Sequence, residues 1–245
     1  MNRFYVDRKN VSADTVVIDD RDQVHHIKDV IRLEPKEPAA VFDDGGTEYD
    51  CVVREVLADK VVLSVKKVIK RETKGKVYIA VACAIPKHSK IDDIIDKLTQ
   101  LGVDRIIPLM TRRVIVRMDG EKQSLRRQRW AKIALAASKQ SQRNSVPIVD
   151  EVTEIQDLIS FSKEFDLKLI PTLSGELKSL KDIIRMSRAC RILALIGPEG
   201  DFTADEVGAA LKAGFIPVSL GNSVLRVETA AVYIAGILHY EFSES

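Results

Sequence analysis

Short apolar segments separated by polar turns make up the first part of the chain. Segments rich in β-branched residues predict strands at residues 15–18, 39–42, 51–56 and 61–68. Between the first two, apolar residues recur at helical spacing, and the predicted buried face carries Val24, Ile27, Val30, Ile31 and Leu33. Several short strands around a single helix predict a small β-barrel domain.

From residue 77 onward, apolar strands alternate with amphipathic helices. Strands are predicted at residues 77–85, 103–109, 167–172, 191–196 and 216–220. Helices are predicted at residues 91–101, 122–140, 180–186, 205–213 and 228–240, and Gly102 is placed to end the first of them. The strand at 77–85 is apolar throughout, which is typical of a parallel sheet covered on both faces. This alternation predicts an α/β fold with a mainly parallel sheet.

A charged, glycine-containing segment at residues 70–76 separates the two patterns and marks a linker. The predicted domains are therefore residues 1–72 and residues 73–245. A chain of 245 residues has room for one sizeable α/β domain and a small companion.

The composition, 45% hydrophobic and 30% charged, is that of a soluble globular protein. The first nine residues carry charges where a signal peptide needs an apolar core, and residues 230–238 are too short to span a bilayer. We expect a cytoplasmic protein. Cys51, Cys83 and Cys190 are far apart and have no ligand-spaced partner, so we predict buried reduced thiols and neither disulfides nor a metal site.

The net charge of +2 is close to neutral, but basic residues gather between positions 105 and 143. They are Arg105, Arg112, Arg113, Arg117, Lys122, Arg126, Arg127, Arg129, Lys132, Lys139 and Arg143. A solvated helix face explains some of them. The excess of one sign is also what a phosphate backbone selects.

Two glycine loops in the second half follow predicted strands. Gly197-Pro198-Glu199-Gly200 follows the strand at 191–196, and Leu220-Gly221 ends the strand at 216–220. Ligands bind α/β sheets at the carboxyl ends of strands, so we expect two adjacent strand ends to present bare backbone and a few charged side chains there. The first loop alone also fits an ordinary turn before a helix capped by Thr203 and Glu206. Phosphate-loop spacings are absent, but two loops side by side would hold a flat adenine.

Two charged residues stand near the start of the last predicted helix. Arg226 lies in an apolar run and, if buried, needs a polar partner such as a substrate or a carboxylate. Glu228 is explained either by the helix dipole alone or by a chemical role.

These motifs resemble the SPOUT methyltransferases, in particular the family that methylates N3 of a uridine in 16S ribosomal RNA of the small subunit. The resemblance is carried by Gly197-Pro198-Glu199-Gly200, by Leu220-Gly221 and by Leu225-Arg226-Val227-Glu228-Thr229-Ala230. It extends upstream through residues 140–147, 101–103 and 26–32, and so covers nearly the whole chain.

The resemblance implies a SPOUT-type parallel sheet with a C-terminal trefoil knot, and an N-terminal PUA-like β-barrel that binds RNA. It also implies S-adenosylmethionine as cofactor, no metal, a homodimer formed through the knot region, and ribosomal RNA or the small ribosomal subunit as partner. The implied cofactor-binding residues are Leu195, Ile196, Gly197, Pro198, Glu199, Gly200, Leu220, Gly221, Asn222, Val224, Leu225 and Arg226.

For methyl transfer to uracil N3, we expect Arg226 to stabilise negative charge on a base carbonyl. Glu199 or Glu228 would accept a proton or position the base, and the sequence does not choose between them. The expected RNA-binding residues are Lys28, Arg32, Arg126, Arg127, Gln140, Arg143 and Asn144. A plain helix end is the alternative explanation for the last three.

The chain departs from the family pattern in several places. Asp201 stands where a second glycine is usual, Ser223 where a basic residue is usual, and Gln100 where Glu is usual; His88-Ser89 replaces a Gly-Asp pair. The exact RNA substrate is therefore open. The alternatives are a SPOUT enzyme acting on another ribosomal or transfer RNA position, and a non-catalytic RNA-binding or ribosome-assembly protein.

Overall fold

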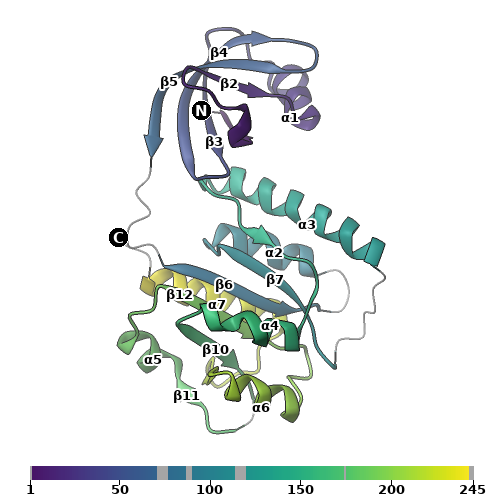
Figure 1. Cartoon of the computed structure of the whole chain (residues 1–245), viewed down its shortest axis with the longest axis vertical. Coiled ribbons are helices and arrows are strands. Elements are labelled where there is room, and N and C mark those ends of the chain that lie inside the picture. The colour runs from purple at the N-terminus through teal and green to yellow at the C-terminus, as the bar shows by residue number, and fades with distance from the viewer. Residues whose placement is uncertain (1, 71–76, 87–89, 114–119, 174, 243–245) are drawn as a thin grey trace. The chain divides into compact units, whose positions relative to one another are not determined.

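A computed structural model describes residues 2–70, 77–86, 90–113, 120–173 and 175–242 (Figure 1). The chain forms two compact units: Met1–Thr73 with Ser138–Val146, and Lys74–Ala137 with Pro147–Ser245. The predicted boundary at residue 72 stays a prediction, and residues 71–76 of the predicted linker lie outside the described residues. Residues 138–146, which comprise the end of the basic helix and the segment after it, pack with the N-terminal strands.

The first unit is a five-stranded sheet with the strand order β1-β3-β4-β5-β2. Its strands are β1 (Asn2–Val6), β2 (Thr15–Ile18), β3 (Pro38–Asp43), β4 (Thr47–Val56) and β5 (Val61–Lys70). Strand β1 pairs in parallel with β3 and also contacts β2, which closes the sheet into the predicted barrel. We did not predict β1, because its buried Phe4 and Val6 stand among charged residues.

The predicted helix of the first unit is present but changes type. It begins as α1 (Arg21–His25) and continues as a π-helix over His26–Ile31. Ile27 is fully buried, whereas Val30 is 61% exposed, so the prediction that Val30 faces the core was wrong. A π-helix has wider turns than an α-helix, so a residue three positions after Ile27 no longer returns to the same face. Ile31, four positions on, packs against the core.

The second unit is built on a parallel sheet with the strand order β11-β13-β10-β12-β6-β7-β8, and β9 also pairs with β7. The strands are β6 (Tyr78–Ala84), β7 (Arg105–Met110), β8 (Ile148–Val149), β9 (Thr153–Glu154), β10 (Leu167–Pro171), β11 (Lys178–Ser179), β12 (Arg191–Ile196) and β13 (Ile216–Ser219). All of their pairings are parallel, which confirms the predicted α/β class. The two-residue strands were missed because they are too short to show a period.

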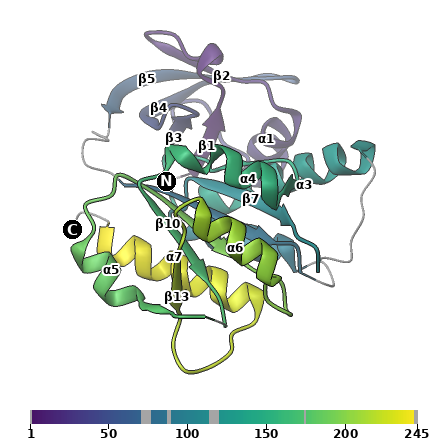
Figure 2. The same ribbon diagram turned by 60° about the horizontal axis from the view of Figure 1, so that its bottom comes forward.

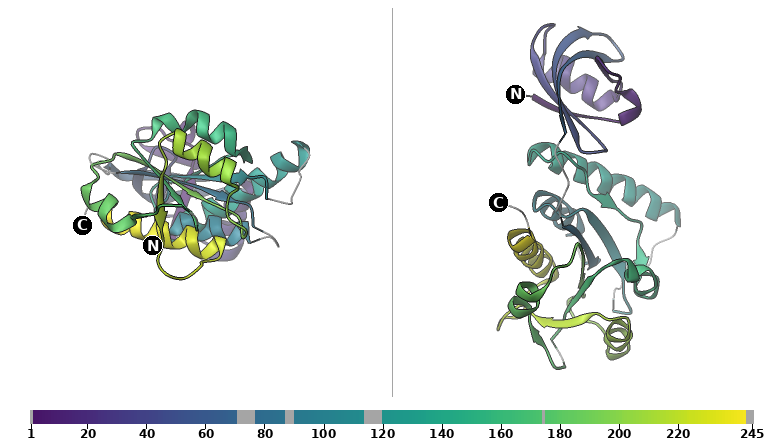
Figure 3. Two further views of the ribbon diagram at one scale, coloured as in Figure 1. Left: turned by 90° about the horizontal axis from the view of Figure 1, so that it is seen from below. Right: turned by 60° about the vertical axis from the view of Figure 1, so that its left-hand side comes forward.

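Helices cover both faces of this sheet (Figures 2 and 3). They are α2 (Ile91–Gln100), α3 (Gly120–Gln140), α4 (Ile155–Phe161), α5 (Leu180–Met186), α6 (Ala204–Lys212) and α7 (Val227–Phe242). Helices α2 and α7 pack together on one face, and α4 and α6 lie on the other. Gly102 has a φ of 85° after α2, as expected of a residue that ends a helix. The threading of the last segment into a trefoil knot stays a prediction.

The amino ends and the carboxyl ends of the parallel strands differ in chemistry. At the amino ends of the strands, Arg105 forms ion pairs with Asp150 at 2.9 Å and with Glu164 at 3.0 Å. Arg191 bonds Glu164 as well and stacks over Tyr78 at 4.3 Å. These charged groups are partners of one another, so ligand binding is expected at the carboxyl ends of the strands.

Candidate active site

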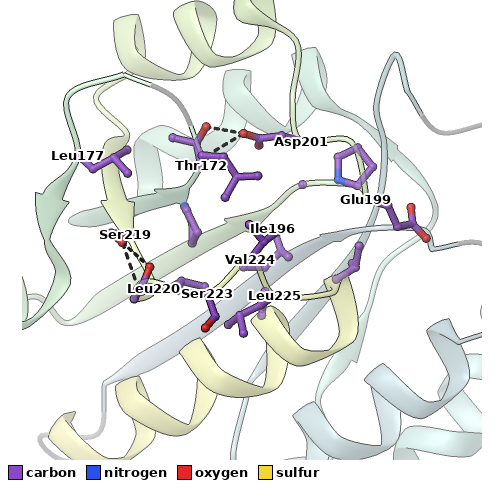
Figure 4. A pocket seen from close by; sticks show the side chains of 17 residues that line it. Thr172, Leu177, Ile196, Glu199, Asp201, Ser219, Leu220, Ser223, Val224 and Leu225 are labelled. Atoms are coloured by element: carbon purple, nitrogen blue, oxygen red, sulfur yellow. Dashed lines mark hydrogen bonds between the residues drawn. The ribbon is translucent and has the colours of Figure 1, made fainter.

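The carboxyl ends of β10, β12 and β13 surround a cavity of about 220 Å³ (Figure 4). Its lining residues are Pro171, Thr172, Leu173, Leu177, Ile196, Gly197, Pro198, Glu199, Asp201, Ser219, Leu220, Gly221, Ser223, Val224, Leu225, Val227 and Ala230. The space is several times the ~30 Å³ share of one water molecule. Apolar walls with a few polar groups are typical of a small-molecule site.

Both glycine loops line this cavity, but their strands are not neighbours. Strand β10 lies between them and pairs in parallel with β12 and with β13. The expectation of adjacent strand ends was therefore wrong, because the order of strands along the chain does not determine their order in a sheet. As a result, residues 171–173 after β10 supply a third wall. The predicted strand at 167–172 was the sequence signal that could have revealed it.

The predicted cofactor residues divide into two groups. Those that line the cavity are Ile196, Gly197, Pro198, Glu199, Leu220, Gly221, Val224 and Leu225. Those that do not are Leu195, Gly200, Asn222 and Arg226. Leu195 is fully buried in the core beneath α4 and α6, because alternate residues of a strand point to opposite faces.

The glycines of the two loops are needed for different reasons. A Cβ on Gly197 would lie 2.9 Å from Cε2 of Phe202, a side chain buried in the core. Gly221 has a φ of 118°, a conformation that side chains with a Cβ rarely adopt. Gly200 has neither constraint, since the nearest atom to an added Cβ is Cδ of Arg113 at 3.6 Å. Gly197 and Gly221, rather than Gly200, therefore need to be glycine.

Side-chain hydrogen bonds stabilise the first glycine loop and the segment after it. Thr203 and Glu206 form the predicted capping box at the start of α6, which confirms that interpretation. Glu206 is buried and also accepts a hydrogen bond from the backbone N–H of Arg112 at 2.8 Å. The guanidinium of Arg113 donates to the carbonyl of Gly200. The loop after β7 thus supports the first glycine loop from outside the cavity.

The three candidate charged residues have different surroundings. Arg226 is exposed, so a need for a buried partner does not explain it. Glu199 is exposed at one end of the cavity, opposite Ser219 and Leu220 (Figure 4). Glu228 lies outside the lining and accepts a hydrogen bond from Nζ of Lys90 at 2.5 Å. Of these two acidic residues, Glu199 lines the cavity and Glu228 does not.

The hydrogen bond from Lys90 lowers the pKa of Glu228 below its usual 4.5. A carboxyl group with a lowered pKa stabilises the folded state above its unfolded pKa, and this stabilisation is lost as the pH falls through the folded pKa. We therefore expect Glu228→Gln to lower the free energy of unfolding at pH 7 and to have a smaller effect below pH 4. Urea unfolding of the wild type and of Glu228→Gln, at pH 7 and below pH 4, measures the difference in free energy. An equal difference at the two pH values would contradict the prediction.

The expected RNA-binding residues are mostly on the surface. Lys28, Arg32, Arg126, Arg127 and Gln140 are exposed. Arg143 and Asn144 are partly buried against the N-terminal strands: Arg3 donates to the carbonyl of Arg143 at 3.1 Å and to the side-chain oxygen of Asn144. Asn144 thus has a structural role in the first unit.

Several residues of the basic segment have acidic partners from distant parts of the chain. Arg112 pairs with Asp205, Arg127 with Glu151, and Arg129 with Asp92. Counting charges along the sequence could not reveal these partners. Arg117 and the side chain of Lys122 lie outside the described part of the chain, as does His88-Ser89.

Three further observations concern metal ligands, membrane spans and cysteines among the described residues. No three or more of their His, Cys, Asp or Glu side chains are grouped to hold a metal ion. No helix within the described ranges has the length and apolar character of a membrane span. Cys51 and Cys83 are buried as predicted, but Cys190 is exposed because it lies in the turn before β12.

Comparison with known proteins matches both parts of the chain. Residues 73–239 match an RNA methyltransferase domain, and residues 18–66 match an RNA methyltransferase PUA domain. The ribosomal RNA small subunit methyltransferase E of Bacillus subtilis is 31% identical over 90% of this chain and 88% of its own length. That of Rickettsia conorii is 30% identical over 94% of this chain and 92% of its own length.

A solved structure is also similar over nearly the whole chain. The ribosomal RNA small subunit methyltransferase E of Neisseria gonorrhoeae, solved bound to S-adenosylmethionine, has a TM-score of 0.85 and 28% identity, and covers 98% of this chain and 97% of its own. With an N-terminal PUA domain followed by an RNA methyltransferase domain, the chain belongs to the ribosomal RNA small subunit methyltransferase E family.

Proposed function

We propose that this protein transfers the methyl group of S-adenosylmethionine to N3 of a uridine in 16S ribosomal RNA. The observation that carries the proposal is the cavity at three parallel strand ends, lined by both glycine loops. The relatives named as small-subunit ribosomal RNA methyltransferases support the substrate class, and the relative solved with S-adenosylmethionine supports the cofactor. An enzyme with this substrate would act in the cytoplasm, where ribosomes are assembled.

The cavity fits a cofactor with a flat apolar base and a polar tail. Leu220, Val224 and Leu225 offer apolar surface for the base. Gly197 and Gly221 place backbone without a Cβ at the cavity wall, and Oγ of Ser219 hydrogen-bonds both the N–H and the C=O of Gly221. S-adenosylmethionine, when bound, supplies a positively charged sulfonium that carries the methyl group to be transferred.

The protein's own task is to make the uridine reactive. Loss of the N3 proton places negative charge on the base carbonyls, and a guanidinium stabilises charge of that kind. We assign this role to Arg226, which is exposed between the second glycine loop and α7. Glu199, at the end of the cavity, is the better candidate to position the base or accept its proton, because it lines the cavity and Glu228 does not.

The RNA is proposed to bind through phosphate contacts from exposed basic residues. Lys28 and Arg32 would contribute from the PUA domain, and Arg126 from α3. Such contacts orient the RNA without reading its sequence. Gln140 and Arg143 would add further polar contacts to the RNA.

Two measurements test the proposed function. Isothermal titration calorimetry of the purified protein should show saturable binding of S-adenosylmethionine. Mass spectrometry of 16S ribosomal RNA from cells lacking the protein should show the loss of one N3-methyluridine. Absence of binding would favour a non-catalytic RNA-binding protein, and loss of a different methyl group would favour another target position.

We also propose that the protein is a homodimer through α7. Tyr233 and Tyr240 on this helix are 47% and 82% exposed. Their spacing places both tyrosines on one side of the helix, and an apolar face of this kind is typical of an interface.

Replacing Tyr233 with glutamate is therefore expected to convert the dimer to a monomer, because a charge in an apolar interface loses its hydration. Sedimentation velocity measures the change. The matched control is Met186→Glu on α5, since Met186 is 85% exposed but lies on another helix. A wild-type protein that sediments as a monomer would refute the proposal.

A further inference from the structure

Asp201 connects two of the three loops around the cavity. Its Oδ2 accepts a hydrogen bond from Oγ1 of Thr172 at 2.8 Å and another from the backbone N–H of Leu173 at 2.8 Å (Figure 4). Its Oδ1 accepts a bond from the backbone N–H of Phe202 at 2.8 Å. We propose that Asp201 is a positioning residue that fastens the wall after β10 to the first glycine loop and so shapes the cofactor site.

The bonds of the carboxylate identify this role. Both of its oxygens already accept hydrogen bonds from the protein, and three N–H or O–H groups converge on it. Thr172 is buried, so its hydroxyl would lose a partner that water does not readily replace. Asp201 therefore acts through the loop that it holds rather than on the substrate.

The backbone of Asp201 shows that its side chain matters. Its φ is 61°, in the left-handed region that glycine occupies most easily. Aspartate tolerates this conformation but does not favour it as glycine does. Glycine would therefore suit the backbone here, and what aspartate adds is the carboxylate.

The fastened wall contributes directly to the cavity. Pro171, Thr172 and Leu173 all line it, yet Leu173 is 62% exposed and has little packing of its own. Without the carboxylate, the loop would have to be ordered when the ligand binds, and that ordering reduces affinity. The effect is thus expected in binding of the cofactor and not in the chemical step.

Asp201→Gly is the decisive variant, because glycine readily adopts the left-handed backbone and the carboxylate is lost. We expect the Kd and the KM for S-adenosylmethionine to rise about tenfold, within the usual range for losing one or two hydrogen bonds. The kcat at saturating cofactor should change by less than about twofold, and the melting temperature only slightly. The Leu173 amide should exchange its hydrogen faster.

Asp201→Asn provides a second variant with the same size and turn preference. An amide has one acceptor oxygen where the carboxylate has two, so its Kd should fall between those of the wild type and Asp201→Gly. Asp205→Asn is the matched control, since Asp205 is exposed and lies outside the cavity lining. It should leave the Kd unchanged.

This inference rests on the proposed function, and the same titration separates the two. A wild-type protein that does not bind S-adenosylmethionine would refute the proposed function. If the wild type binds S-adenosylmethionine and Asp201→Gly binds it equally well, the role of Asp201 is overturned and the proposed function is not. A lower kcat at unchanged KM would also overturn it.

Discussion

Replacing Arg226 with alanine is expected to reduce kcat by about 100-fold or more. Removing one donor that stabilises developing negative charge in other enzymes costs 10²–10³ in kcat. Arg226 does not line the cavity, so the Kd for S-adenosylmethionine should stay within about threefold of the wild-type value. Single-turnover methylation of 16S ribosomal RNA, together with calorimetry of cofactor binding, measures both quantities.

Arg226→Lys is the informative companion to this variant. It retains the charge but loses the planar donor geometry of the guanidinium, so partial activity is expected. Because Arg226 is exposed, we expect neither substitution to lower the melting temperature, and a thermal melt checks this. Unchanged methylation by Arg226→Ala would dismiss the proposed role.

Gly197→Ala is expected to weaken binding of S-adenosylmethionine by at least tenfold. The new Cβ would lie 2.9 Å from Phe202, so the ring or the loop must move. Phe202 is buried, and overpacking of a core typically costs about 1–3 kcal/mol. Because Gly197 also lines the cavity, a shift of its loop changes the surface that the ligand meets. Calorimetry measures the Kd, and a thermal melt the cost in stability.

The matched control is Gly200→Ala in the same loop. An added Cβ there has its nearest neighbour at 3.6 Å, an ordinary contact, and Gly200 does not line the cavity. Its Kd should therefore remain close to that of the wild type. Equal losses in the two variants would mean that the loop needs flexibility rather than space at Gly197.

The sequence alone determined whether most elements are helices or strands, and it indicated that the site lies at the carboxyl ends of strands. Strand and helix periods, the cap at Thr203 and the glycine after α2 are local signals, because each depends on residues a few positions apart. The glycine loops stood out for the same reason. The strand β1 and the outward turn of Val30 were missed because neighbouring charges and a π-helix disturb those local patterns.

The tertiary structure alone decided which segments meet. It placed β10 between the strands of the two glycine loops, and it brought Thr172 to Asp201. It also gave Arg127 and Arg129 acidic partners from other elements. These contacts join residues far apart in the chain, and their pairing follows from the order of strands in the sheet. A periodic pattern contains no information about that order.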